Sequence, residues 1–125
     1  ALCQKIHSEL HGILVMADVA TFDEGVAAAE CGADFVGTTM NGYTANTASD
    51  LKNGANIALV ARLAEALPNA KIIAEGRYHR PDDVINALNA GAYSVVVGTA
   101  ITAPGWITSE FAAAANIAKK SAKLS

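Results

Sequence analysis

The chain has 125 residues, the length of one ordinary domain, and a formal net charge of −3. Its 52% hydrophobic content with only 6% aromatics suits helices packed on buried parallel strands. The basic residues are scattered rather than gathered in a stripe, so we expect no nucleic-acid partner. No apolar run reaches the roughly 18 residues that span a bilayer, so no membrane association is expected. The two cysteines lack a CxxC spacing, which favours buried free thiols in a reducing cytoplasm.

The first part of the chain predicts helix, strand, helix, strand. Apolar residues at helical spacing over 2–10 indicate the first helix. The continuous apolar run 13–17 is typical of a strand covered on both faces. Thr21 and Glu24 have the spacing of a capping box, which predicts that a helix begins there. The second strand is expected over 34–37.

The same alternation continues after a polar loop over 38–50. The further predicted elements are a helix over 57–67, a strand over 71–74, a helix beginning at Pro81, a strand over 93–97, and a last helix that begins between 104 and 109. Strands that alternate with helices predict an α/β fold with parallel strands.

An internal repeat narrows this fold class further. Gly32 aligns with Gly91 and Asp23 aligns with Asp82 at the same spacing, so two consecutive strand–helix units recur. Repeated units of this kind are typical of (βα)₈ TIM barrels, which need roughly 250 residues. We therefore predict that residues 1–125 form a single half-barrel domain of four parallel βα units.

Polar groups follow all four predicted strands, at the end where barrel enzymes place their active sites. These residues are Asp18, Thr38, Thr39, Tyr43, Glu75, Gly76, Arg77, Gly98 and Thr99. Gly76 and Gly98 permit close backbone approach, Thr99 adds a hydroxyl, and Arg77 adds a permanent charge beside helix N-termini that favour anions. Together they predict a phosphate site, and the neighbouring carboxylates extend it to a phosphorylated sugar.

Several of these residues have a second interpretation. Glu75 is either a general acid/base at a rigid strand end or a structural carboxylate paired with Arg77 or a backbone amide. Asp18 either contacts substrate or caps the turn before Thr21. Tyr43 is either a surface residue or a lid contact. No histidine pair has the spacing of metal ligands, so no metal is expected.

Four sequence blocks give a more specific indication. ADxxTxxEG and DFVGTTxxGYT lie within residues 14–44, and IAEGR and VVVGxAIT lie within residues 72–102. In this order they resemble the N-acetylmannosamine-6-phosphate 2-epimerase family, over nearly the whole chain but only the C-terminal half of that enzyme. The resemblance implies a (βα)₈ barrel, no cofactor and a cytoplasmic location. It also implies interconversion of N-acetylmannosamine 6-phosphate and N-acetylglucosamine 6-phosphate in sialic acid breakdown.

The resemblance also implies roles for single residues. In the family, the glutamate of the AEGR block and a lysine on an earlier strand move the C2 proton, and the glutamate falls on Glu75. Asp18 would orient the sugar, and Gly76 and Gly98 would hold the phosphate. The chain departs from the family in two ways: the lysine's segment is expected before its first residue, and Ala103 stands where the family usually has arginine.

These observations leave three hypotheses. The first is the C-terminal half of a sugar-phosphate epimerase, inactive alone. The second is a non-catalytic, phosphate-binding half-barrel that self-associates. The third is a barrel enzyme acting on a phosphorylated pentose, against which the GTTxxGYT and AEGR blocks argue. Because open sheet edges template association, we expect a homo-oligomer or completion by an N-terminal half.

Overall fold

The computed structural model describes the backbone of residues 2–122 and the side chains of residues 2–117. It confirms the alternation of strands and helices that the sequence predicts. The elements are α1 (Leu2–Glu9), β1 (Met16–Asp18), α2 (Phe22–Glu30), β2 (Phe35–Gly37), the 3₁₀ helix η1 (Ala48–Asn53), α3 (Ile57–Ala66), β3 (Lys71–Glu75), α4 (Pro81–Asn89), β4 (Ser94–Val96), α5 (Thr99–Thr102) and α6 (Pro104–Ala122).

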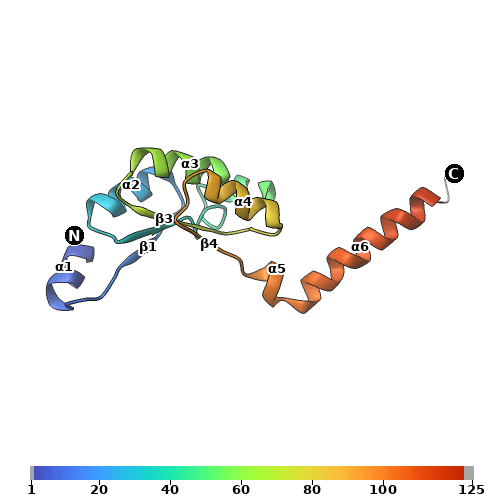
Figure 1. Cartoon of the computed structure of the whole chain (residues 1–125), viewed down its shortest axis with the longest axis horizontal. Coiled ribbons are helices and arrows are strands. Elements are labelled where there is room, and N and C mark those ends of the chain that lie inside the picture. The colour runs from blue at the N-terminus through green and yellow to red at the C-terminus, as the bar shows by residue number, and fades with distance from the viewer. Residues whose placement is uncertain (1, 123–125) are drawn as a thin grey trace.

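The four strands form one parallel sheet in the order β1-β2-β3-β4. Asp18 pairs in register with Gly37, and Glu75 pairs with Val96, so the carboxyl ends of all four strands meet at one edge. Helices α2, α3 and α4 lie along one face of this sheet, with α1 and α6 at opposite ends of the molecule (Figure 1). The arrangement is that of half a TIM barrel.

The core lies between the sheet and this layer of helices. Its largest fully buried side chains are Val36, Val60, Leu63 and Ile72. Gly25 allows α2 and α3 to approach closely, because a Cβ atom there would lie 2.5 Å from a methyl group of Leu63. This packing fixes the strand ends, which carry the polar residues, on a rigid base.

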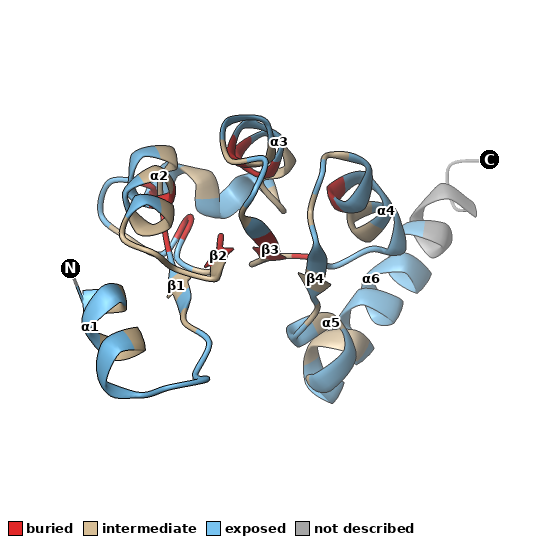
Figure 2. Ribbon diagram, turned by 60° about the vertical axis from the view of Figure 1, so that its left-hand side comes forward, coloured by how far each residue is buried: buried red, intermediate tan, exposed pale blue. Residues whose placement is uncertain are grey.

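The other face of the sheet is uncovered by any described element (Figure 2). The expectation that the run 13–17 is a strand covered on both faces is therefore wrong. The strand begins only at Met16, and Ile13 and Leu14 are 52% and 65% exposed, because they precede the stretch that pairs with β2. The two cysteines, expected to be buried, are free and half-buried.

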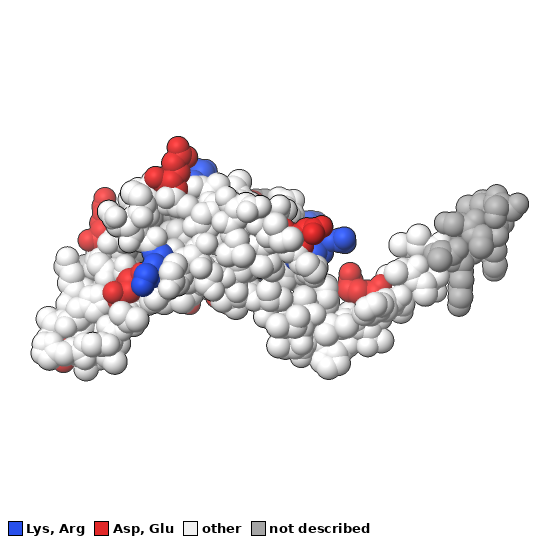
Figure 3. Space-filling view, in the orientation of Figure 1, with Lys and Arg blue, Asp and Glu red and all other residues white. Residues whose placement is uncertain are grey.

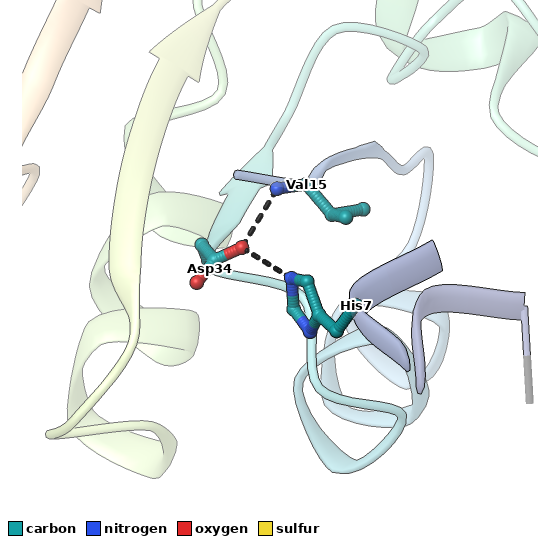
Figure 4. Close-up of polar contacts among 3 residues, drawn as sticks. All are labelled: His7, Val15 and Asp34. Carbon is teal, nitrogen blue, oxygen red and sulfur yellow. Dashed lines mark hydrogen bonds and ion pairs between the residues drawn. The ribbon is translucent and has the colours of Figure 1, made fainter. Parts of the chain in front are cut away.

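Asp34 ties α1 to the sheet. Its carboxylate accepts hydrogen bonds from the Val15 backbone N–H at 2.7 Å and from the His7 ring at 2.9 Å (Figure 4). The Val15 hydrogen bond, with a smaller contribution from His7, holds the pKa of Asp34 below its usual value against an opposing desolvation. No helix within the described residues is long and apolar enough to cross a membrane.

Candidate active site

The carboxyl edge of the sheet contains a cleft of about 210 Å³ between the ends of β3 and β4. Seven of the nine residues that the sequence predicts for the site line it: Thr39, Tyr43, Glu75, Gly76, Arg77, Gly98 and Thr99. Tyr78, His79 and Val96 complete the lining. The cleft therefore combines one carboxylate, one guanidinium and two glycine turns, as the sequence pattern suggested.

Two carboxylates meet at a single threonine hydroxyl beside this cleft. The Thr39 hydroxyl lies 3.1 Å from Glu75 Oε2 and 2.9 Å from Asp18 Oδ1. Asp18 is outside the cleft lining, but this hydroxyl connects it to Glu75. The end of β1 is thereby joined to the end of β3 across β2.

The neighbouring Thr38 has a different position. It is 2% exposed, and its hydroxyl accepts from the Glu75 N–H at 3.0 Å and donates to the Glu75 carbonyl at 2.9 Å. Thr38 therefore lies behind the cleft and fixes the Glu75 backbone, whereas Thr39 faces the carboxylates. The sequence places both threonines at this strand end, and the structure shows that Thr39 lines the cleft whereas Thr38 does not.

Arg77 anchors the long loop that follows β2. Its guanidinium donates to the Gly54 carbonyl at 2.6 Å, to Asn41 Oδ1 at 3.0 Å and to the Asn41 carbonyl. Gly42 makes this possible, since a Cβ atom there would collide with the guanidinium. The same charge lies 5.7 Å from the centre of the Tyr43 ring. The loop and its exposed tyrosine are therefore held against the cleft.

The backbone at the end of β3 is left-handed at two consecutive residues. Gly76 has φ 101° and Arg77 has φ 63°, the one non-glycine residue with positive φ in the described chain. Such a conformation is costly for a residue with a Cβ atom, so the guanidinium contacts must hold it. Within the described residues Glu75 forms no ion pair with Arg77, so that structural alternative for Glu75 is not observed.

At the end of β4, Gly98 is the residue that precedes the short helix α5. The first N–H groups of a helix lack partners within it, so Thr99 and Ala100 have no acceptor within α5, whereas Ile101 and Thr102 donate to the Gly98 carbonyl. No heavy atom lies within 4 Å of where a Gly98 Cβ would be. Ala103 follows α5 at its other end and is outside the cleft lining.

Tyr78 forms part of the cleft wall but is itself 3% exposed. Its hydroxyl makes no hydrogen bond with any described residue. Burial, reinforced by the negative charge of Asp83 and opposed by Arg77, raises the pKa of Tyr78 to about 12. No group of three or more His, Cys, Asp or Glu side chains suitable for a metal ion occurs within residues 2–117.

Four parallel βα units with polar groups at the carboxyl ends of their strands define half of a TIM barrel, with the candidate site at the edge where such barrels place theirs. Residues 1–117 match the family model described as "Putative N-acetylmannosamine-6-phosphate epimerase". The chain belongs to this family, which confirms the resemblance stated from its sequence blocks.

Three relatives illustrate the match. A protein from Caldanaerobacter subterraneus subsp. tengcongensis, described as "Putative N-acetylmannosamine-6-phosphate 2-epimerase", is 45% identical over 108 residues. These residues cover 86% of this chain and 44% of the relative. A second relative with this description, from Corynebacterium glutamicum, is 45% identical over 101 residues, which cover 81% of this chain and 43% of the relative. The solved N-acetylmannosamine-6-phosphate 2-epimerase from Clostridium perfringens superimposes with a TM-score of 0.78 at 40% identity, over 89% of this chain and 46% of that one. The chain thus spans less than half the length of these relatives.

Proposed function

We propose that this chain supplies the C-terminal half of an epimerase that interconverts N-acetylmannosamine 6-phosphate and N-acetylglucosamine 6-phosphate. The observation that carries the proposal is the position of Glu75. Its carboxylate lies in a cleft at the carboxyl end of β3, where a threonine hydroxyl orients it and two glycine turns flank it. The choice of this reaction is supported by the relatives' names, because this chain belongs to the same family.

The chemistry requires an acid/base group on each face of C2. Removing the C2 proton leaves the electron pair of the C–H bond in an enolate, delocalised over C2, C1 and the carbonyl oxygen at C1. Returning a proton to C2 from the opposite face gives the epimer. We assign one of these transfers to Glu75, since a carboxyl group fixed at a strand end can both accept and donate a proton.

Among the described residues, no lysine lines the cleft to supply the second group. Lys71 begins β3, at the opposite end from Glu75, and its ammonium lies 5.2 Å from the ring centres of Phe35 and Tyr93. We therefore infer that the partner of Glu75 is the lysine that the family resemblance places on an earlier strand, outside these residues. The chain alone would then not catalyse epimerisation.

The phosphate is proposed to bind between the ends of β3 and β4. The backbone N–H groups at Gly76, Gly98 and Thr99 would donate to it, because glycine turns and helix starts present such donors to anions. Three of the guanidinium N–H groups of Arg77 are used by Asn41 and Gly54, which leaves two of its five for substrate. Tyr43 would close over the sugar from the loop that Arg77 holds.

The uncovered sheet face is proposed to be completed by the other half of the barrel. Met16, Tyr93 and Val96 are exposed on or beside this face, and β1 and β4 are open edges. Open edges and apolar faces favour association, so a homo-oligomer is the alternative way to cover them. The same uncovered face also favours the second candidate, a non-catalytic half-barrel that binds phosphate and self-associates.

We place the complete enzyme in the cytoplasm, in the breakdown of sialic acids.

A completed barrel distinguishes the two candidates. The N-terminal part of the Caldanaerobacter relative is joined ahead of this chain, and interconversion of the two sugar phosphates is followed by proton NMR. We expect turnover, and a loss of roughly 10²–10⁴-fold in Glu75→Gln, the range of general acid–base catalysis. Glu65→Gln, which removes an exposed carboxylate on α3, is the matched control. A folded completed barrel without turnover, or full activity in Glu75→Gln, would contradict the proposal.

A further inference from the structure

The hydroxyl of Thr39 lies between two carboxylates that come from different strands. Its oxygen is 2.9 Å from Asp18 Oδ1 and 3.1 Å from Glu75 Oε2. Gly37 creates the room for this contact, because a Cβ atom there would lie 3.1 Å from the Thr39 oxygen and 3.3 Å from Asp18 Oδ1. A side chain at position 37 would therefore press on both groups at once.

A hydroxyl has one proton to donate and two lone pairs that accept. When both carboxylates are ionised, Thr39 can donate to only one of them. The contact between its oxygen and the other carboxylate oxygen then has no proton between the two atoms and is not a hydrogen bond. When Glu75 carries a proton, it donates to Thr39, and Thr39 donates to Asp18. Both contacts are then hydrogen bonds, and the chain Glu75–Thr39–Asp18 is complete.

We propose that Thr39 is a positioning residue for Glu75, an inference that rests on the proposed epimerase function. The hydroxyl accepts from Glu75 when that group is a carboxylic acid and donates to it when it is a carboxylate. It can therefore hold the same carboxyl orientation before and after a proton moves to or from C2. Asp18 serves as the acceptor that keeps the hydroxyl in place during the protonated state.

This role predicts a specific kinetic effect. Thr39→Val keeps the shape of the side chain but removes the hydroxyl, so Glu75 loses its orienting partner while the phosphate contacts remain. Misplacing a reacting group costs on the order of 10²-fold in rate, so we expect kcat to fall by about 10- to 100-fold while KM changes less than about threefold. Thr39→Ser restores the hydroxyl and is expected to recover most of the lost kcat.

The experiment compares these variants in the completed barrel described above. Thr108→Val, which removes an exposed threonine hydroxyl from α6, is the matched control and is expected to leave both constants unchanged. Wild-type kcat in Thr39→Val would overturn the proposal. An equal loss in Thr39→Ser and Thr39→Val would also overturn it, because shape rather than the hydroxyl would then matter.

A second measurement separates this inference from the proposed function. If the folded wild-type barrel shows no turnover, the proposed function fails, and the link is tested without catalysis. The carboxyl ¹³C signals of Asp18 and Glu75 are followed by NMR during a pH titration of the 125-residue chain. We expect each signal to respond to protonation of the other group in the wild type and in Thr39→Ser, and to respond less in Thr39→Val. The same cross-response in all three chains would contradict the hydroxyl link.

Discussion

Removing the Arg77 side chain tests how the loop beside the cleft is held. The guanidinium donates to the Gly54 carbonyl and twice to Asn41, from a half-buried position. Hydrogen bonds that involve a charged group are worth about 1.5–3 kcal/mol each, and water replaces part of that value at a partly exposed site. We therefore expect Arg77→Ala to lower the free energy of unfolding by about 2–4 kcal/mol.

The backbone conformation gives this prediction a second, independent part. Because Arg77 has φ 63°, alanine at this position keeps a costly left-handed conformation that glycine adopts freely. After the larger entropy of glycine in the unfolded chain is subtracted, Arg77→Gly should be more stable than Arg77→Ala by about 0.5–1 kcal/mol. At most helical or strand positions the order would be the reverse.

Urea unfolding followed by circular dichroism measures both differences. Lys52→Ala removes an exposed cation from the same loop and should change stability by less than about 0.5 kcal/mol. Limited proteolysis adds a local readout, since both Arg77 variants should be cut faster within residues 41–54 than the wild type. Wild-type stability in Arg77→Ala, or lower stability in Arg77→Gly than in Arg77→Ala, would refute the reasoning.

The further predictions concern three single residues. Because burial raises the pKa of Tyr78 to about 12, ionisation of its hydroxyl above pH 10 favours the unfolded chain. The free energy of unfolding should therefore fall by about 2–3 kcal/mol between pH 10 and pH 12 in the wild type, and this fall should be absent in Tyr78→Phe. At neutral pH, Tyr78→Phe should gain about 1 kcal/mol by removing an unpaired buried hydroxyl, and a clear loss would show that the hydroxyl has a partner. Asp34 has a lowered pKa, so its stabilisation of α1 is present above pH 3.8 and lost below it; amide exchange in α1 should show this acid step in the wild type and not in Asp34→Asn. Ala103→Arg should tighten sugar-phosphate binding by the completed barrel about 10- to 150-fold, and a change below about twofold would place position 103 away from the phosphate.

The elements of the fold were predictable because local signals and tertiary packing agree. The capping box forms as expected: Thr21 accepts from the Glu24 N–H, and the Glu24 carboxylate accepts from the backbone at Thr21. Pro81 opens α4, as its fixed backbone angle favours. The boundary of β1 was not predictable, because pairing with β2 rather than the local apolar run decides where that strand begins.

The site was only partly predictable, because spacing locates strand ends but not side-chain directions. Seven of the nine predicted residues share one cleft, and all of them except Tyr43 share it because the parallel sheet brings the strand ends together. The contacts of Arg77 with Asn41 and Gly54 depend on how the long loop after β2 folds back. This loop has no periodic pattern of apolar residues from which its conformation could be predicted. Whether Thr38 or Thr39 faces the cleft depends on the alternation of side chains along the strand. This alternation is lost where the strand passes into a turn, so the sequence does not decide between the two residues.

Exchange of the C2 proton with solvent tests most directly whether Glu75 performs acid–base chemistry on a sugar phosphate. The completed barrel is incubated with N-acetylmannosamine 6-phosphate in D₂O, and deuterium at C2 is followed by NMR and mass spectrometry. The account predicts that the wild type incorporates one deuterium at C2 as it forms the epimer, and that Glu75→Gln does so at least about 100-fold more slowly. Incorporation at the wild-type rate by a folded Glu75→Gln barrel would contradict the account.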